Sequence, residues 1–301
     1  TPEKGLYYCF GCHKGGTAFT FIMEMENLSF VEAAEYLAKK AGVEIDVSAS
    51  NQQSGHQKAV LDLYTRVTQS FNYLLKTHEE AQRAREYLKK RGISDESIDK
   101  FLIGWAPYNR SWLYSFLSKK HYSDEFLAQS GLFSKKRKNI SFFAGRIMFP
   151  IKKATGQVIG FGGRALADDT PKYINSTESL FFKKRENLYG LSEALAHIRK
   201  EKVFVLVEGY LDVIAMSQAG IPYAVAPLGT AFTTNQANIL KRYADNSIVI
   251  FDGDTAGIEA TKKALYALEQ SGIESSVVLM EEGNDPADVL AKEGPQELKN
   301  K

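Results

Sequence analysis

The sequence predicts an α/β fold (α+β overall), because short apolar segments alternate with helical segments in its C-terminal third. Strands that alternate with helices indicate a mainly parallel sheet with flanking helices. At 301 residues and 44% hydrophobic composition, the chain can bury a large core and divide into two or more domains. The expected strands are 203–207, 223–226, 247–251 and 275–280, and the expected helices between them are about 211–219, 233–243 and 256–271.

Residues 1–45 are predicted to form a small separate module. A helix is expected over about 17–26. A second helix is expected to start at Ser29, whose hydroxyl can cap it while Glu32 reaches back in a capping box. It should end at Gly42, since glycine readily adopts the left-handed conformation that closes helices.

Residues 46–57 are polar, and we interpret them as a flexible linker to the rest of the chain. Residues 58–200 then form a predicted mixed, basic subdomain, and residues 201–301 form the α/β subdomain. The segment 58–120 has apolar residues at helical spacing, whereas 140–164 changes to the pattern of a β-hairpin.

Charge is segregated along the chain although the net charge is only +2. Residues 134–200 hold 14 Lys and Arg against 5 Asp and Glu, whereas residues 201–301 hold 8 against 15. A basic block beside an acidic one is typical of a protein that binds a polyanion and a metal ion. Taken alone, such blocks are more often merely solvated surfaces.

Composition also limits where the protein works. No signal peptide is recognisable, and no apolar run approaches the roughly 20 residues that a membrane span needs. Only two cysteines occur, so no disulfide framework is expected, and a reducing cytoplasm is favoured.

Acidic side chains follow three of the predicted strands. The carboxyl ends of strands in an open α/β sheet line the functional crevice, so these carboxylates should converge. Closely packed like charges raise one another's pKa unless a cation neutralises them, which predicts Mg²⁺ or Mn²⁺. An isolated D-G-D is more often a turn than a ligand, but three such clusters in order favour a metal site. The acids are Glu208, Asp212, Asp252, Asp254 and Asp285.

These motifs resemble a known family. E-G-Y-x-D, F-D-G-D-x-A-G and N-D-P, in that order, resemble the Toprim catalytic domain of primases, type IA and II topoisomerases and some nucleases. Three further segments, at 171–176, 188–191 and 226–231, resemble the DnaG-type bacterial replicative DNA primases over essentially the whole chain. The resemblance implies a Toprim-like sheet preceded by a basic subdomain and a partial zinc-ribbon module.

The resemblance also implies roles for the acids. Glu208 matches the essential acid, Asp252 and Asp254 match the metal-binding pair, and these three would be catalytic. Asp285 matches an outlying ligand, and Asp212 matches a supporting acid of the same metal site.

One position departs from the family pattern. Many relatives have D-P-D where this chain has Asp285, Pro286, Ala287 and Asp288. A carboxylate is therefore absent at 287, and whether Asp288 replaces it is left open.

Basic and polar residues of the middle segment match the family's template- and nucleotide-binding surface. Arginine and lysine can contact phosphates, while tyrosine and asparagine can stack on or hydrogen-bond a nucleotide. The run at 135–138 lacks such a motif and is predicted to be an exposed hairpin end. The expected DNA- or nucleotide-binding residues are Arg146, Arg164, Lys172, Tyr173, Asn175 and Lys183.

Cys9 and Cys12 have the C-x-x-C spacing of half a tetrahedral zinc site, although such a pair can also be redox-active or incidental. His13 is too close to Cys12 to be a comfortable ligand and is predicted to be a surface residue. The resemblance identifies the pair as the second half of a zinc ribbon. Its first half would precede Thr1, so the Zn²⁺ site is incomplete within this sequence.

The resemblance implies an enzyme that makes short RNA primers from ribonucleoside triphosphates on single-stranded DNA during replication. Its partners would include the replicative helicase, through a C-terminal domain outside this sequence, and single-stranded DNA-binding protein. It would work in the cytoplasm, at nucleoid-associated replication forks, with no membrane contact.

Three alternatives remain open from the sequence. A Toprim topoisomerase or nuclease shares the acids, but a topoisomerase also needs a tyrosine nucleophile in a gate domain. A phage-type primase–helicase would carry a G-x-x-x-x-G-K-[ST] phosphate loop, which does not occur here. A non-catalytic module that binds single-stranded DNA would keep the acids only as remnants.

Overall fold

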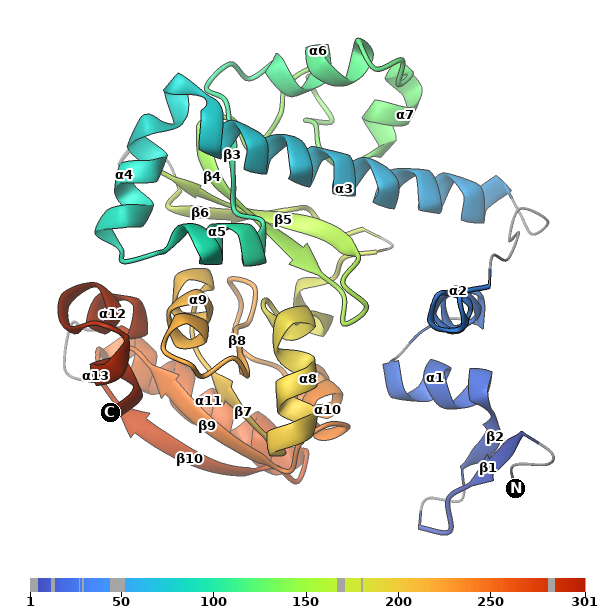
Figure 1. The fold of residues 1–301 in the computed structure, drawn as a ribbon, viewed down its shortest axis with the longest axis vertical. Coiled ribbons are helices and arrows are strands. Elements are labelled where there is room, and N and C mark those ends of the chain that lie inside the picture. The colour runs from blue at the N-terminus through green and yellow to red at the C-terminus, as the bar shows by residue number, and fades with distance from the viewer. Residues whose placement is uncertain are drawn as a thin grey trace. The chain divides into compact units, whose positions relative to one another are not determined.

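The computed structural model describes residues 5–11, 14–26, 28, 30–43, 52–166, 171–179, 181–280 and 285–300. The chain divides into two compact units, 1–59 and 60–301 (Figure 1). Each is described by itself.

The first unit contains a two-stranded antiparallel hairpin followed by two helices. Both helices lie where the sequence predicts them. Gly42 follows the second helix with φ +66°, which confirms the predicted left-handed end. The expected cap at Ser29 lies outside the described residues. The elements are β1 (Leu6–Tyr8), β2 (Gly15–Thr17), α1 (Ala18–Glu26) and α2 (Phe30–Ala41).

The long helix α3 (Gln52–Thr77) starts earlier than expected. Residues 52–57 are helical, so the prediction that they belong to a flexible linker is wrong. Adding residues to an existing helix is easy, whereas starting one is costly. The buried side chains Val60, Leu63 and Val67 stabilise the helix, which then extends back through the polar residues.

Short helices follow α3, as the spacing of apolar residues predicts. The structure also contains a strand, β3 (Gly104–Ala106), in a segment expected to be purely helical. Its three residues are all buried, and such a short run shows no alternation that sequence could reveal. The helices are η2 (Glu79–Ala81), α4 (Gln82–Lys90), α5 (Asp95–Phe101), α6 (Trp112–Ser118) and α7 (Asp124–Gln129).

An antiparallel sheet with the strand order β3-β4-β5-β6 forms the centre of the N-terminal half of the second unit. Strands β4 (Arg146–Lys152) and β5 (Val158–Ala165) confirm the predicted hairpin, and β6 (Tyr173–Asn175) pairs with β5. The basic run at 135–138 is exposed at a hairpin-like turn closed by the bridge between Phe133 and Ser141, as predicted.

The C-terminal half confirms the predicted parallel sheet. Its strand order is β10-β9-β7-β8, and every pairing is parallel. The carboxyl ends of neighbouring strands lie together, since Leu206 pairs with both Val225 and Val249. The strands are β7 (Val203–Leu206), β8 (Ala224–Val225), β9 (Asn246–Phe251) and β10 (Glu274–Leu279).

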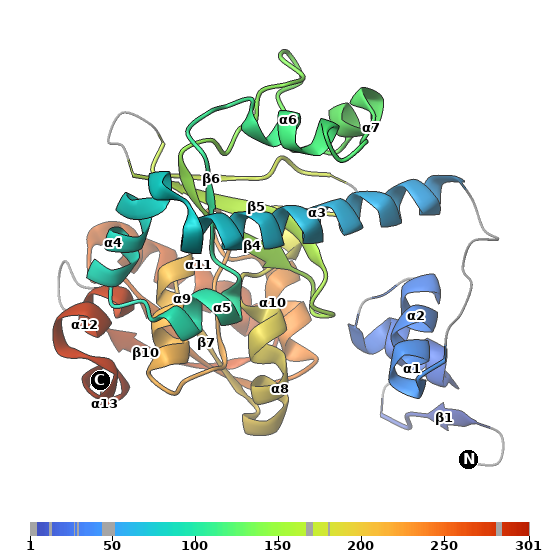
Figure 2. The same ribbon diagram turned by 45° about the horizontal axis from the view of Figure 1, so that its top comes forward.

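Helix α9 (Tyr210–Gln218) joins the two halves of the second unit, because it lies beside α5 in both views (Figures 1 and 2). Gln218 accepts a hydrogen bond from the Ser94 N–H at 2.9 Å and donates one to the Gly92 carbonyl at 2.9 Å. Seven of the nine residues of α9 are buried. The other elements are η3 (Lys184–Glu186), α8 (Leu191–Glu201), α10 (Thr234–Lys241), α11 (Thr255–Gln270), α12 (Pro286–Glu293) and α13 (Pro295–Asn300).

Within the described part of the chain, no helix combines the length and apolar character needed to cross a membrane.

The contact between α3 and β3 leads to a stability prediction. A Cβ added at Gly104 would lie 2.5 Å from the Phe71 Cβ and 2.7 Å from its carbonyl carbon. We expect Gly104→Ala to lower the free energy of unfolding by about 1–3 kcal/mol, since backbone must move to relieve this overlap. Urea unfolding measures the change.

Gly55→Ala is the matched control. No atom lies within 4 Å of a Cβ added at Gly55, which is in helix α3. The same substitution should therefore be neutral or stabilise by up to about 1 kcal/mol. Equal changes in the two variants would show that the overlap at Gly104 has no energetic effect.

Candidate catalytic site

Two acidic turns meet where strands β7 and β9 end. A carboxylate oxygen of Glu208, after β7, accepts a hydrogen bond from the Asp252 backbone N–H at 2.9 Å, after β9. Gly257 makes this approach possible: a Cβ there would lie 2.1 Å from the Asp252 carbonyl oxygen and 2.9 Å from Glu208 Oε1. Gly257, the last residue of the F-D-G-D-x-A-G motif, is therefore required because it packs against both acidic turns.

Two more acids begin helices at this edge. Asp254 caps α11 and accepts from the Gly257 N–H at 2.7 Å. Asp285 caps α12 and accepts from the Asp288 N–H at 2.6 Å. A carboxylate has two oxygens, so each residue can fix a helix N-terminus and still present an oxygen to a cation.

Asp212 lies behind these acids and is only 6% exposed. One of its carboxylate oxygens accepts from the Gly209 N–H at 2.9 Å, and the other accepts from the Ala287 N–H at 3.3 Å. It therefore connects the turn that carries Glu208 to the start of α12. This arrangement supports a structural connection more directly than the metal ligation expected for Asp212.

The structure also shows how the departure at 287 is accommodated. The Ala287 side chain is buried, and the Ala287 backbone N–H donates a hydrogen bond to the Asp212 carboxylate. Asp288 pairs at 2.5 Å with Arg91, the residue that directly follows α4. Asp288 is therefore engaged by a cation from the other half of the unit.

The raised pKa values of these acids show that their charges interact. Burial, and after it the charges of Glu208, Asp285 and Asp254, raise the pKa of Asp252 to about 6. Burial likewise raises the pKa of Glu208, whereas the hydrogen bond from the Asp252 N–H acts in the opposite direction and lowers it. The pKa of Asp212 rises to about 8 through burial and then through Asp285 and Asp252. A cation would relieve this repulsion.

Hard oxygen donors on a rigid rim fit a divalent ion such as Mg²⁺ or Mn²⁺. Among the described residues, however, no three histidine, cysteine or acidic side chains are gathered closely enough to form a ready metal cluster. The charges of Glu208, Asp254 and Asp285 all act on Asp252, so the four acids lie near enough to interact electrostatically.

An arginine from the antiparallel sheet faces α4. The Arg164 guanidinium lies 4.5 Å from the centre of the Tyr87 ring and 5.0 Å from that of Tyr173, and donates to the Tyr173 hydroxyl at 2.6 Å. Burial raises the pKa of Tyr173 to about 12, against the opposing effect of Arg164. The Arg164 Nε is buried and has no hydrogen-bond partner among the described residues, so one N–H donor of this guanidinium is unused.

Sequence reasoning missed Tyr87 and Arg91. Both lie at the C-terminal end of α4, and the Arg91 guanidinium lies 5.8 Å from the centre of the Tyr87 ring. Their four-residue spacing places them on one helix face. Nothing in that helical pattern distinguishes them from ordinary surface residues.

The remaining predicted binding residues differ in their surroundings. Arg146 is buried and donates to the Pro171 carbonyl at 2.8 Å. Asn175 donates to the Leu228 carbonyl at 2.8 Å and accepts from the Tyr210 hydroxyl. Both side chains thus make internal contacts, whereas Lys172 and Lys183 are exposed.

In the first unit, Cys9 is exposed and its backbone N–H donates to the Lys14 carbonyl at 2.8 Å, within the turn between β1 and β2. Cys12 and His13 lie outside the described residues.

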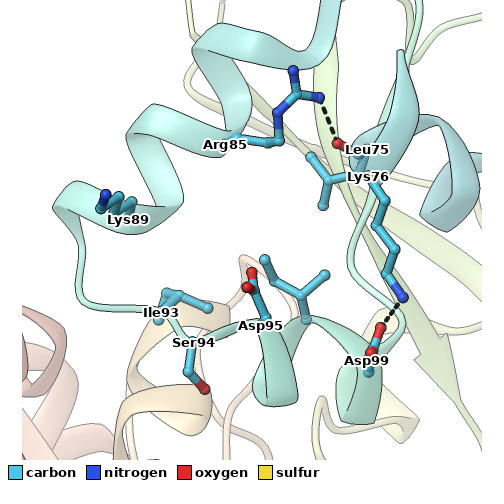
Figure 3. A pocket seen from close by; sticks show the side chains of 9 residues that line it. Leu75, Lys76, Arg85, Lys89, Ile93, Ser94, Asp95 and Asp99 are labelled. Carbon is cyan, nitrogen blue, oxygen red and sulfur yellow. Dashed lines mark hydrogen bonds and ion pairs between the residues drawn. The ribbon is translucent and has the colours of Figure 1, made fainter.

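A cavity of about 680 Å³ lies between the end of α3, α4 and α5 (Figure 3). Lys76 and Asp99 pair across it, while Arg85 points to the Leu75 carbonyl. None of the acids or predicted binding residues lines this cavity, so we do not assign the chemistry to it. Its lining also includes Lys89, Ile93, Ser94, Asp95 and Ile98.

Comparison with family models divides the chain into three matched regions. Residues 1–53 match the CHC2 zinc finger, residues 70–195 match the N-terminal domain of the DNA primase catalytic core, and residues 205–290 match a Toprim-like domain. Domains of the first and third kinds bind zinc and divalent metal ions, respectively.

Curated relatives extend the similarity over nearly the whole chain. The DNA primase of Treponema pallidum is 42% identical over 99% of this chain, and that of Geobacillus stearothermophilus is 40% identical over 96%. The chain spans half the length of each relative.

Solved structures agree. The zinc-binding and RNA polymerase domains of the Aquifex aeolicus primase match with a TM-score of 0.75 and 38% identity, covering 100% of this chain and 73% of that one. A DnaG primase catalytic domain bound to single-stranded DNA matches with a TM-score of 0.72 and 36% identity, covering 82% and 78%. The chain therefore belongs to the family of DnaG-type bacterial DNA primases.

Proposed function

We propose that this chain carries the RNA-polymerising core of a primase, which synthesises short RNA primers from ribonucleoside triphosphates on single-stranded DNA. The observation that carries the proposal is the placement of the strand-end acids near cationic residues of the other half. Asp285 interacts electrostatically with Arg91, and Asp212 does so with Tyr173, whose hydroxyl accepts a hydrogen bond from Arg164. The acids alone would suit any Toprim enzyme. The match of residues 70–195 to a primase domain favours primase over topoisomerase or nuclease.

Glu208, Asp252, Asp254 and Asp285 would hold Mg²⁺ or Mn²⁺, and Glu208, Asp252 and Asp254 would be catalytic. A bound ion would lower the pKa of the primer 3′-hydroxyl and offset charge on the leaving pyrophosphate. Asp212 would hold the turn that carries Glu208 beside the start of α12 through the two backbone N–H groups that it binds.

The cationic residues would hold the polyanionic substrates. Arg164, Lys172 and Lys183 would bind template and triphosphate phosphates through charge-assisted hydrogen bonds. Tyr173 would offer an aromatic side chain to a base, because the residue as a whole is 36% exposed. Arg146 and Asn175 would act by shaping this surface, given their internal contacts.

The domain and partner assignments complete the proposal. Residues 1–45 would be part of a zinc ribbon with Cys9 and Cys12 as ligands, 58–200 the basic subdomain and 201–301 the Toprim subdomain. Helicase and single-stranded DNA-binding protein would be partners of the longer protein, at replication forks in the cytoplasm.

Asp252→Asn and Asp254→Asn test the catalytic assignment. Each removes a charge, and asparagine at 254 can still cap α11. We expect primer synthesis on a single-stranded template to fall at least about 100-fold, because loss of a metal ligand removes several kcal/mol of charge stabilisation. Single-stranded DNA binding, measured by fluorescence anisotropy, should stay within about twofold.

Asp62→Asn, at an exposed position of α3, is the control and should leave both readouts unchanged. A parallel loss of DNA binding and synthesis in the site variants would indicate misfolding. Full synthesis in both variants would show that the Asp252 and Asp254 charges are not needed for the reaction and would overturn the catalytic assignment.

The raised pKa of Asp252 predicts a metal- and pH-dependent stability. A folded-state pKa of about 6 exceeds the ordinary value of 3.8, so ionisation penalises the folded state increasingly as pH rises from 4 to above 6. In EDTA at pH 8, Asp252→Asn should therefore raise Tm by roughly 2–4 °C. The gain should shrink toward pH 4.

Mg²⁺ should raise the Tm of the unmodified chain at pH 8 more than that of Asp252→Asn, as measured by differential scanning fluorimetry. A variant that is less stable than the unmodified chain at pH 8 in EDTA would contradict the proposed repulsion among the acids.

A further inference from the structure

The N-terminal end of helix α10 contacts a basic turn, which we define as residues 183–187. Gln236 is completely buried, and its side-chain nitrogen donates to the Lys184 carbonyl at 3.0 Å and to the Asn187 carbonyl at 2.6 Å. The Thr233 hydroxyl donates to the Arg185 carbonyl at 2.7 Å. Three backbone carbonyls of the turn are thus bound by two side chains.

The same two residues also form the capping box of α10. The Thr233 hydroxyl accepts from the Gln236 N–H at 3.2 Å, and the Gln236 side-chain oxygen accepts from the Thr233 N–H at 3.0 Å. Both polar atoms of the Gln236 side-chain amide are therefore used. The oxygen accepts from the start of α10, and the nitrogen donates to the basic turn. The start of α10 and the basic turn are fixed by one network.

This network determines which way the basic turn faces. The carbonyls of Lys184, Arg185 and Asn187 are held by α10, and the side chains of Lys183 and Arg185 are exposed. Among the described residues Lys183 pairs with Glu186, at 3.1 Å between two half-exposed groups, and such a surface pair contributes little. The two cations are thus presented on a backbone that is fixed before any ligand binds.

We propose that Gln236 and Thr233 are positioning residues for phosphate binding by the basic turn. They do not touch substrate themselves; they hold Lys183 and Arg185 where phosphate oxygens of the template or of an incoming triphosphate can reach them. The inference rests on the proposed function for its reaction, but its claim about phosphate binding can be tested without primer synthesis. Preorganisation should improve affinity because the turn need not be ordered on binding.

Gln236→Glu tests the proposal selectively. Glutamate keeps an oxygen for the Thr233 N–H and so preserves the capping box, but it replaces the donor to two carbonyls with an acceptor. The basic turn should be released while α10 stays capped. We expect binding of a single-stranded oligonucleotide, measured by anisotropy in EDTA, to weaken roughly 3- to 10-fold, or the KM for ribonucleoside triphosphate to rise by that factor with kcat unchanged.

The two measurements separate the two phosphate sources, since weaker oligonucleotide binding identifies template phosphates and a higher KM identifies the triphosphate. Thr233→Val provides a second variant, because it removes the hydroxyl while keeping the shape. Thr233→Ser should restore behaviour within about twofold of the unmodified chain, since serine also caps helices and keeps the hydroxyl.

Ser123→Ala controls for general destabilisation. Ser123 caps α7 by accepting from the Phe126 N–H at 3.3 Å, so its loss removes a helix cap without involving the basic turn. It should lower Tm but not oligonucleotide affinity or KM. Unchanged affinity and KM in both Gln236→Glu and Thr233→Val, or an equal weakening in Ser123→Ala, would overturn the proposal. Absence of primer synthesis in the unmodified chain would instead count against the proposed function, and the anisotropy result would still decide this inference.

Discussion

The structure of the acidic edge depends on backbone N–H groups that hold mutually repelling carboxylates in place. Glu208 accepts from Asp252, Asp254 accepts from Gly257, and Asp285 accepts from Asp288. Gly257 and Asp288 lie in the first turns of α11 and α12, so their N–H groups are donors that the helix itself leaves unpaired, whereas the Asp252 N–H directly follows strand β9. The fold thereby supplies fixed partial positive charge before any cation binds.

This arrangement does not remove the repulsion. The pKa of Glu208 is raised although its carboxylate accepts a hydrogen bond from the Asp252 N–H, because burial and the charges of Asp254 and Asp285 outweigh that bond. The acidic edge therefore stores electrostatic free energy that a divalent cation can release on binding. Arg91 offsets part of the charge by pairing with Asp288, which explains why α4, far away in sequence, approaches α12. The two halves of the second unit thus complement each other in charge as well as in packing.

Much of the fold follows from the sequence, because strong patterns were available. The alternation of apolar and helical segments predicted the parallel sheet, and the acids after its strands predicted the edge at which Glu208 meets Asp252. The failures have physical causes: β3 is too short to show a period, and residues 52–57 became helical by extension from buried turns. Tyr87 and Arg91 were missed because their role comes from tertiary contacts with Arg164 and Asp288.

Residue type also proved insufficient to tell binding from support. Arg146 and Asn175 have the chemistry of ligand-binding residues, but their polar atoms contact backbone carbonyls of neighbouring segments. Gln236 has no obvious functional chemistry, yet it holds the turn that exposes Lys183. Such backbone contacts are invisible in sequence, since they depend on where a carbonyl points rather than on which side chain it carries. A fold that binds a flexible polyanion needs both kinds of residue: an exposed cation attracts the phosphate, and a buried amide fixes the backbone from which that cation extends.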